Sequence, residues 1–237
     1  MFPREPRLPK LDERLACALE LVPKCRTVAD IGADHGRLSL HLLKSKTCQH
    51  VIVSDVSEHS LMKAKRLLRF HQEEGRATFV CADGLAALTM PVDAVVILGL
   101  GGSSISRILE MGRQQLGQAQ LIVSAQTETH KLRRTLVKCG YAMVQERVVR
   151  TLGRYYTVIQ AVPGIARYTD RELYLGPTLV GTPSAKLADY LCWRMDVLAM
   201  AEGAQDSEQM NWLREALAHA HSDCGNDLSL HRCDRAF

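Results

Sequence analysis

Aspartates and glycines alternate in a short segment between an apolar run and a helical pattern. The segment reads Asp30-x-Gly32-x-Asp34-x-Gly36. Glycines there let the chain turn sharply and bring backbone N–H groups close to a ligand at the N-terminus of the next helix. A dinucleotide-binding fingerprint normally has glycine at position 34, where an aspartate would lie against the pyrophosphate of NAD at a high electrostatic cost. S-adenosylmethionine (SAM) carries a sulfonium and an ammonium but no phosphate, so this segment favours SAM over NAD.

Two further aspartates follow later strand patterns. Asp55 ends the second run, near the spacing at which an acidic residue bonds ribose hydroxyls, and Asp83 with Gly84 ends the third, where it could meet an adenine amino group. Each alone is more often a turn aspartate or a helix N-cap. Three acidic residues at successive strand ends, which face one crevice in a parallel sheet, predict a cofactor-binding site.

A glycine-rich loop follows the fourth strand pattern. It reads Gly99-Leu100-Gly101-Gly102. It offers no side-chain base, but bare backbone permits the close approach of a flat ring. The alternative is a tight strand-to-helix turn, which needs one of these glycines but not three.

These loops require an alternation of strands and helices. β-rich runs lie at Thr27–Ile31, Val51–Asp55, Ala77–Ala82, Asp93–Leu98 and Ala119–Ser124. Helical patterns follow at Arg37–Lys46, Ser57–Glu74, Ser103–Gly112 and Thr127–Cys139. This alternation predicts βαβ units and a parallel sheet. Ser57 is a predicted N-cap, and Gly140 is placed to end the last of these helices.

The pattern changes after Gly140. Segments 141–149 and 154–162 are strand candidates separated by a short turn. They bring the sheet to seven strands and end it in an antiparallel hairpin, which is typical of the class I SAM-dependent methyltransferase fold, a Rossmann-like α/β architecture. A Gly- and Pro-rich connector and two helices, Ser184–Met200 and Ser207–His221, predict a small C-terminal helical hairpin. We therefore expect a methyltransferase domain at residues 1–164 and a connector with a helical domain at residues 165–237, which the family resemblance described below implies to be coiled-coil-like.

Composition limits the classes of protein. The chain has 237 residues, 46% of them hydrophobic, so it can bury a sizeable core. Its charged and Pro-rich beginning predicts no signal peptide, and no apolar run reaches the ~20 residues of a membrane span. We expect a cytoplasmic protein without membrane contact. The eight cysteines form no C-x-x-C pair, so no metal site is expected.

Basic residues gather between positions 131 and 154. They include Lys131, Arg133, Arg134, Arg147, Arg150 and Arg154, with Tyr156 close behind. Only Glu146 opposes them there. Cations for phosphates and aromatic planes for bases suit a structured RNA. On charge alone, a solvated surface is nearly as good an interpretation.

Taken in order, several motifs resemble one family. ADIGADHGRL, ADGL, GLGGSSISRILEMG, LRRTLVKCGY and RYYTVI are similar to the TrmK family of bacterial methyltransferases, which modify N1 of adenine 22 in tRNA. The resemblance covers residues 11–162 and continues weakly beyond. It implies a SAM loop that includes His35, and tRNA as the partner. Asp34 then lies near the reacting centre, and Asp55 stands where the family usually has glutamate.

The resemblance extends to further positions. Four of these are expected to bind the cofactor: Asp83, Gly84, Gly99 and Gly101. Three are expected to bind the substrate: Gly102, Arg133 and Tyr156. The chain departs from the family at Ser124-Ala125-Gln126, where Q-P-N is usual, and at Thr157, where glutamate is usual.

The resemblance implies direct methyl transfer to a neutral ring nitrogen. Asp34 would orient the adenine N6 amino group or take its proton, and the carbonyls of Gly99 and Leu100 would hold the same group. The alternatives are a methyltransferase for another RNA or a small molecule, and a SAM- or RNA-binding homologue without catalysis. A monomer is favoured.

Overall fold

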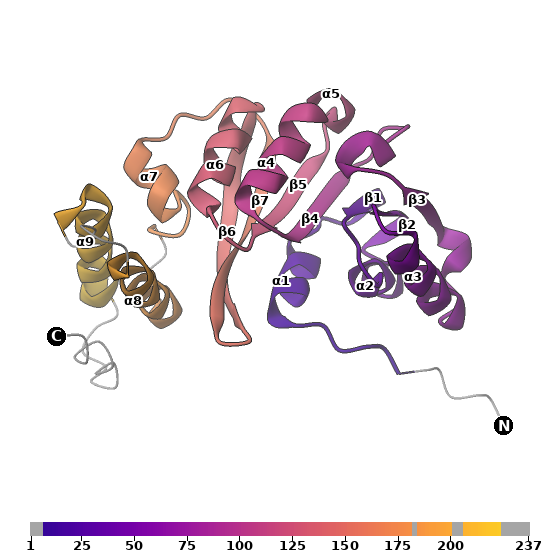
Figure 1. The fold of residues 1–237 in the computed structure, drawn as a ribbon, viewed down its shortest axis with the longest axis horizontal. Coiled ribbons are helices and arrows are strands. Elements are labelled where there is room, and N and C mark those ends of the chain that lie inside the picture. The colour runs from indigo at the N-terminus through magenta and orange to yellow at the C-terminus, as the bar shows by residue number, and fades with distance from the viewer. Residues whose placement is uncertain (1–6, 182–183, 201–205, 224–237) are drawn as a thin grey trace.

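The computed structural model describes residues 7–181, 184–200 and 206–223. Within these residues the strands form one seven-stranded sheet in the order β3-β2-β1-β4-β5-β7-β6 (Figure 1). They are β1 (Cys25–Ile31), β2 (Cys48–Asp55), β3 (Ala77–Cys81), β4 (Ala94–Leu100), β5 (Gln120–Ala125), β6 (Tyr141–Thr151) and β7 (Arg154–Pro163). Strands β1 to β5 are parallel, whereas β7 pairs antiparallel with both β5 and β6. The predicted class I methyltransferase topology is confirmed.

Helices cover both faces of the sheet (Figure 1). One face holds α1 (Glu13–Leu21), α2 (Arg37–Lys44) and α3 (Glu58–Phe70), and the other holds α4 (Gly102–Met111), α5 (Arg113–Leu116) and α6 (Thr129–Lys138). Side chains of a strand alternate between these two cores: Val28 packs toward α1–α3, whereas Ala29 and Ile31 pack toward α4–α6. The sheet is therefore buried on both sides, as a parallel sheet requires.

Local signals set most of the helix ends. The Ser57 hydroxyl accepts the N–H of Ser60 at 3.3 Å, which confirms the predicted N-cap of α3. Gly140 has φ +86° just after α6, as expected of a helix-ending glycine. Helix α3 ends at Phe70, earlier than predicted, because Gln72 takes a left-handed φ of +60° and residues Glu74–Arg76 form the short 3-10 helix η1.

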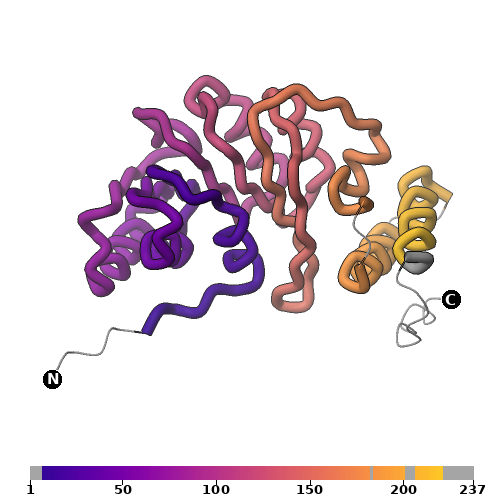
Figure 2. The backbone as a smooth tube through the Cα atoms, turned by 180° about the vertical axis from the view of Figure 1, so that it is seen from behind, coloured from indigo at the N-terminus to yellow at the C-terminus, as the bar shows by residue number. Residues whose placement is uncertain are grey.

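The described residues beyond the sheet form three helices, α7, α8 and α9. The predicted pair is present as α8 (Ala185–Ala199) and α9 (Glu208–Asp223). Sequence analysis missed α7 (Asp170–Leu175), which begins in a capping box of Thr169 and Glu172 inside the expected connector. These helices share a third core, which packs on Val148 and Tyr155 of the β6–β7 hairpin, and α8 and α9 lie at one end of the molecule (Figure 2). The domain boundary at residue 164 stays a prediction.

None of the described helices is long and apolar enough to cross a membrane. In the same part of the chain, no group of three or more His, Cys, Asp or Glu side chains could hold a metal ion.

Candidate active site

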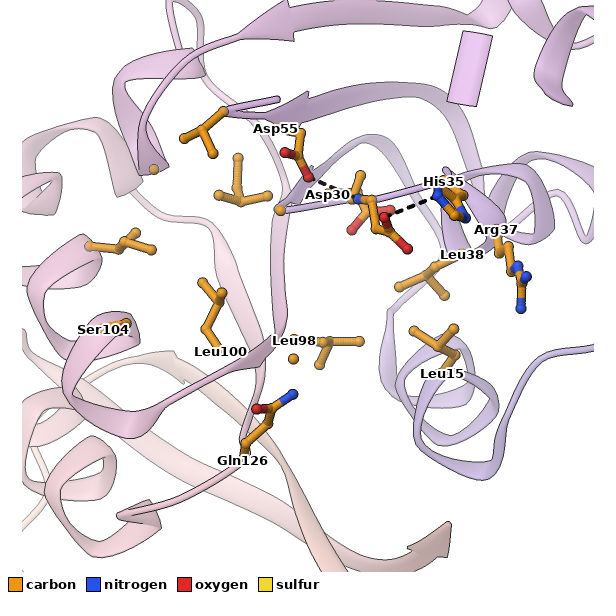
Figure 3. A pocket seen from close by; sticks show the side chains of 18 of the residues that line it. Leu15, Asp30, His35, Arg37, Leu38, Asp55, Leu98, Leu100, Ser104 and Gln126 are labelled. Atoms are coloured by element: carbon orange, nitrogen blue, oxygen red, sulfur yellow. Dashed lines mark hydrogen bonds and ion pairs between the residues drawn. The ribbon is translucent and has the colours of Figure 1, made fainter. Parts of the chain in front are cut away.

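A cavity of about 720 Å³ opens at the carboxyl ends of β1, β2 and β4. It lies where the strand order reverses between β1 and β4, which is the usual ligand position in an open parallel sheet. Eight of the predicted cofactor-binding residues line it: Asp30, Gly32, Asp34, His35, Asp55, Asp83, Gly84 and Gly99. Asp55 and His35 lie on one side and Gln126 on the opposite side (Figure 3). The topology thus brings together the three strand ends that the sequence singled out.

The loop after β1 is shaped by three residues with positive φ. Gly32 has φ +72°, Asp34 +49° and Gly36 +69°. Gly36 does not line the cavity, and a Cβ there would lie 2.7 Å from the Cβ of Ala64. Its lack of a side chain therefore allows α2 to approach α3, and its predicted contact with the cofactor is not supported by this placement.

Asp30 is the buried acid of the site. Its Oδ2 accepts the Ser39 hydroxyl at 2.6 Å. Burial raises the pKa of the Asp30 carboxyl to about 6, against the lowering effect of the Ser39 hydrogen bonds and with a further raising effect from the charge of Asp55. A bound cation would favour its ionised form.

Asp55 organises the loop that carries Asp34. Its two carboxylate oxygens accept the backbone N–H of Asp34 at 3.0 Å and of Ser57 at 2.9 Å. The side chain of Asp34 is 72% exposed, and its Oδ1 lies 3.4 Å from Nε2 of His35. The same ring nitrogen of His35 lies 3.2 Å from Nζ of Lys63. The carboxylate of Asp34 is therefore accessible at the mouth of the cavity.

The far end of the cavity follows β3. Asp83 lies 3.5 Å from the guanidinium of Arg107 on α4. Gly84 has φ +55°, and a Cβ there would stand 3.1 Å from the side chain of Ile108. The backbone at this end is thus close to α4.

The glycines after β4 have different roles. Gly99 lines the cavity with φ +79°. Gly101 caps α4, and Gly102 lies against the loop before α6, where a Cβ would meet the carbonyl oxygens of Glu128 at 2.6 Å and Thr127 at 2.7 Å. Neither Gly101 nor Gly102 lines the cavity. Gly102 therefore allows α4 to approach the loop before α6, and this placement does not support its expected contact with the substrate.

Sequence analysis missed the contribution of α1. The cavity is also lined by Asp12, Arg14 and Leu15. The Arg14 side chain is 17% exposed, its guanidinium lies over the Tyr156 ring at 5.4 Å, and its nearest carboxylate in the described chain is Asp12 at 4.0 Å. Its Nε is buried and has no hydrogen-bond partner among the described residues. No local motif marks Arg14, because only the tertiary fold brings α1 to this cavity.

The basic stretch does not form one surface. Arg133 is 1% exposed, its Nε donates to Glu146 at 2.7 Å, and its Nη1 donates to the carbonyls of Leu173 and Tyr174. It is inaccessible to a phosphate, so its prediction as a substrate-binding residue is wrong.

The other cations of the stretch divide between α6 and the β6–β7 hairpin. On α6, Lys131 pairs with Glu128 and Arg134 pairs with Asp170 at 2.8 Å. On the hairpin, Arg147 pairs with Glu20 at 2.6 Å, while Arg150 and Arg154 are exposed near its tip. Tyr156 is partly buried beneath Arg14.

A model of the methyltransferase domain family matches residues 11–159. The chain belongs to this methyltransferase family. A tRNA (adenine(22)-N(1))-methyltransferase of Bacillus subtilis is 29% identical over 157 residues, which span 65% of this chain and 66% of that protein, just under two thirds. A putative tRNA methyltransferase of Mycoplasma pneumoniae is 31% identical over 168 residues, or 68% of this chain and 76% of that protein.

Solved structures share the methyltransferase fold over nearly their whole length. A putative tRNA (m1A22) methyltransferase of Streptococcus pneumoniae, in complex with SAM, has a TM-score of 0.78 at 24% identity, covering 90% of this chain and 99% of that one. The m1A22 tRNA methyltransferase TrmK of B. subtilis has a TM-score of 0.74 at 23% identity, covering 91% and 99%. The resemblance to the TrmK family is confirmed.

Proposed function

We propose that this protein transfers a methyl group from SAM to N1 of an adenine in tRNA, at the position 22 named for its relatives. The observation that carries the proposal is the cavity: three carboxylates from successive strand ends line it, and so does Asp34 in the loop after β1. A carboxylate in that loop is compatible with SAM and disfavours a pyrophosphate. The name of the relative at 29% identity gives the same reaction, and the relative at 31% identity is named a putative tRNA methyltransferase.

The residues of the cavity fit the charges of SAM. Buried Asp30 suits the ammonium group, because an ionised carboxylate of such low exposure is stabilised by a nearby cation. Each carboxylate oxygen of Asp55 accepts one backbone N–H and retains capacity for a ribose hydroxyl. The buried Nε of Arg14, which lacks a partner in the described chain, suits the carboxylate of the methionine moiety.

In this proposal, positioning contributes more to the rate than a strong base. When bound, SAM supplies the methyl group on a sulfonium whose thioether is already a good leaving group. The exposed Asp34 carboxylate accepts a hydrogen bond from the N6 amino group and stabilises the positive charge that N1 methylation gives the ring. The backbone carbonyls of Gly99 and Leu100, at the cavity wall, hold the same amino group in line.

Exposed cations are proposed to bind the tRNA backbone. They are Lys131, Arg134, Arg147 (half-buried, with 40% of its side chain exposed), Arg150 and Arg154. The exposed ion pairs of the first three are worth little, so phosphates can replace their carboxylates. We further propose a cytoplasmic protein, with residues 1–164 as the catalytic domain.

Labelled SAM with bulk tRNA, followed by nucleoside analysis, tests the reaction. The expected product is 1-methyladenosine, and a tRNA transcript with guanine in place of adenine 22 should accept no label. Asp34→Asn should lower the transfer rate roughly 100-fold while it leaves the affinity for S-adenosylhomocysteine (SAH) within a few-fold.

Two outcomes would favour the alternatives. Label on another RNA or on small molecules would redirect the substrate assignment. SAH binding without transfer to any RNA would indicate a homologue without catalysis.

A further inference from the structure

The β6–β7 hairpin extends beyond the edge of the sheet that holds the cavity. Strand β7 pairs with β5 as far as Val123 opposite Ile159, and this register places Ala125, the end of β5, level with Thr157. From there to the turn at Gly153 the hairpin advances four residues, or roughly 13 Å at about 3.3 Å per residue. Figures 1 and 2 both show it projecting between α1 and the C-terminal helices.

The tip of this hairpin is an exposed leucine in an unfavourable conformation. Leu152 and Gly153 form the two-residue turn between Thr151 and Arg154, and both have positive φ, +50° and +77°. Such turns favour Asn or Gly at the position of Leu152, because the Cβ of most other L-residues is strained at positive φ. Leu152 is also 97% exposed. A side chain this exposed buries little apolar surface, and strained positions that persist are often functional.

The hairpin is anchored on both sides below its tip. On the α1 side, the backbone N–H of Arg150 donates to Glu13 at 3.4 Å, and the guanidinium of Arg14 lies over the Tyr156 ring. On the α8 side, Tyr155 lies 5.6 Å from the ring of Trp193 and belongs to the helical core. The lower part of the hairpin is therefore well packed, and its tip projects beyond these contacts.

Two cations flank the leucine. Arg150 and Arg154 are exposed, and neither guanidinium has an acidic partner within the described ranges 7–181, 184–200 and 206–223. The Arg150 guanidinium lies 5.4 Å over the ring of Tyr155, which fixes its direction on the hairpin. An isolated apolar side chain between two cations that lack acidic partners in the described chain suits a polyanion with an apolar interior better than it suits another protein surface.

We propose that Leu152 is a wedge that enters the base stack of the tRNA while Arg150 and Arg154 contact the flanking phosphates. This inference rests on the proposed function. N1 of a stacked or paired adenine is inaccessible, so the base must leave the stack to enter the cavity. An apolar side chain inserted between base steps offsets part of the lost stacking. The tip lies on the same edge of the sheet as the cavity that receives the base.

Leu152→Asn separates this role from a structural one. Asparagine accepts the positive φ of the turn, so the variant should be at least as heat-stable as the wild type. Ile165→Asn is the matched control, because Ile165 is also 97% exposed but follows β7 at the opposite edge of the sheet. Each variant is tested for SAH affinity, tRNA affinity, methyl transfer and the fluorescence of 2-aminopurine placed at the target position of the tRNA.

We expect the wild type and Ile165→Asn to raise 2-aminopurine fluorescence severalfold, as an unstacked base requires. Leu152→Asn should bind tRNA within threefold of the wild type, abolish most of the fluorescence rise and lower methyl transfer at least tenfold, with SAH affinity unchanged. Arg150→Gln with Arg154→Gln should instead weaken tRNA binding and flatten its dependence on salt.

Wild-type fluorescence and rate in Leu152→Asn would overturn the wedge. Loss of a concentration-dependent self-association in that variant would also overturn it, because the tip would then dock on a second copy of the chain. If the wild type itself methylates no tRNA, the proposed function fails and the wedge fails with it. If the wild type methylates tRNA and Leu152→Asn has the same rate and the same fluorescence rise, the wedge proposal fails while the proposed function stands.

Discussion

At the scale of single residues, the cavity has an excess of carboxylates. Asp12, Asp30, Asp34, Asp55 and Asp83 line it, against Arg14, Arg37 and Arg107 and the imidazole of His35. Arg107 is paired with Asp83, whereas the buried Nε of Arg14 lacks a partner in the described chain. SAM carries two cationic groups and one carboxylate. In the proposed function, the aspartates of the cavity suit its cationic groups and Arg14 suits its carboxylate.

Arg14→Met should weaken SAH roughly tenfold or more, as loss of a charge-assisted hydrogen bond implies. It should leave the affinity for 5′-methylthioadenosine, which lacks the amino-acid group, unchanged. Calorimetry with the two ligands measures the difference. An equal loss for both would show that Arg14 only shapes the cavity.

Asp30 should make cofactor affinity depend on pH. Its folded-state pKa of about 6 exceeds the ordinary 3.8, so its contribution to stability is present below pH 3.8 and is lost as the pH rises through 6. A ligand with an ammonium group favours the carboxylate, so SAH affinity should fall by up to about tenfold per pH unit below pH 6. Calorimetry from pH 5 to 7.5 measures this, with Asp30→Asn expected to flatten the profile and His35→Gln expected to retain it.

At the scale of elements, two glycines of these motifs allow neighbouring segments to pack closely. Gly36 sits against α3 and Gly102 against the loop before α6, whereas Gly101 is open, with Thr127 Oγ1 no closer than 3.5 Å to an added Cβ. The motif that marks a ligand loop in the sequence therefore also contains packing positions.

Gly102→Ala should destabilise the protein by about 1–3 kcal/mol, because the added methyl meets two backbone carbonyls that cannot move cheaply. Gly101→Ala is the neighbouring control and should cost much less. Urea unfolding of both variants measures the difference. Equal midpoints would contradict the packing role assigned to Gly102.

At the scale of the whole molecule, one buried ion pair joins the catalytic and C-terminal parts. Arg133 of α6 bonds Glu146 of β6 and the carbonyls that end α7, and Glu146 also accepts the N–H and hydroxyl of Thr178 at 3.1 and 3.2 Å. This pair fixes the connector against the sheet. The C-terminal helices then pack on the base of the hairpin proposed to meet the tRNA.

Arg133→Met should cost about 3–5 kcal/mol of stability, since it leaves Glu146 buried without its partner. Arg134→Met, which removes an exposed pair, should cost less than about 1 kcal/mol but should weaken tRNA binding at low salt. Chemical unfolding and filter binding across salt concentrations distinguish the two. A stable Arg133→Met variant with weak tRNA binding would contradict the structural role of Arg133 and indicate that it contacts the tRNA.

The sequence by itself determined the sheet and the cofactor class, and it predicted the candidate site at the strand ends. Strand and helix periods are local, and parallel topology necessarily brings Asp30, Asp55 and Asp83 to one edge. Only the tertiary structure decided which face of α6 is buried, so that Arg133 became a core residue through carbonyls 40 and 41 positions away. It also placed Arg14 in the cavity and Gly102 against Glu128. These outcomes depend on contacts between segments far apart in the chain, and residue spacing carries no signal for such contacts.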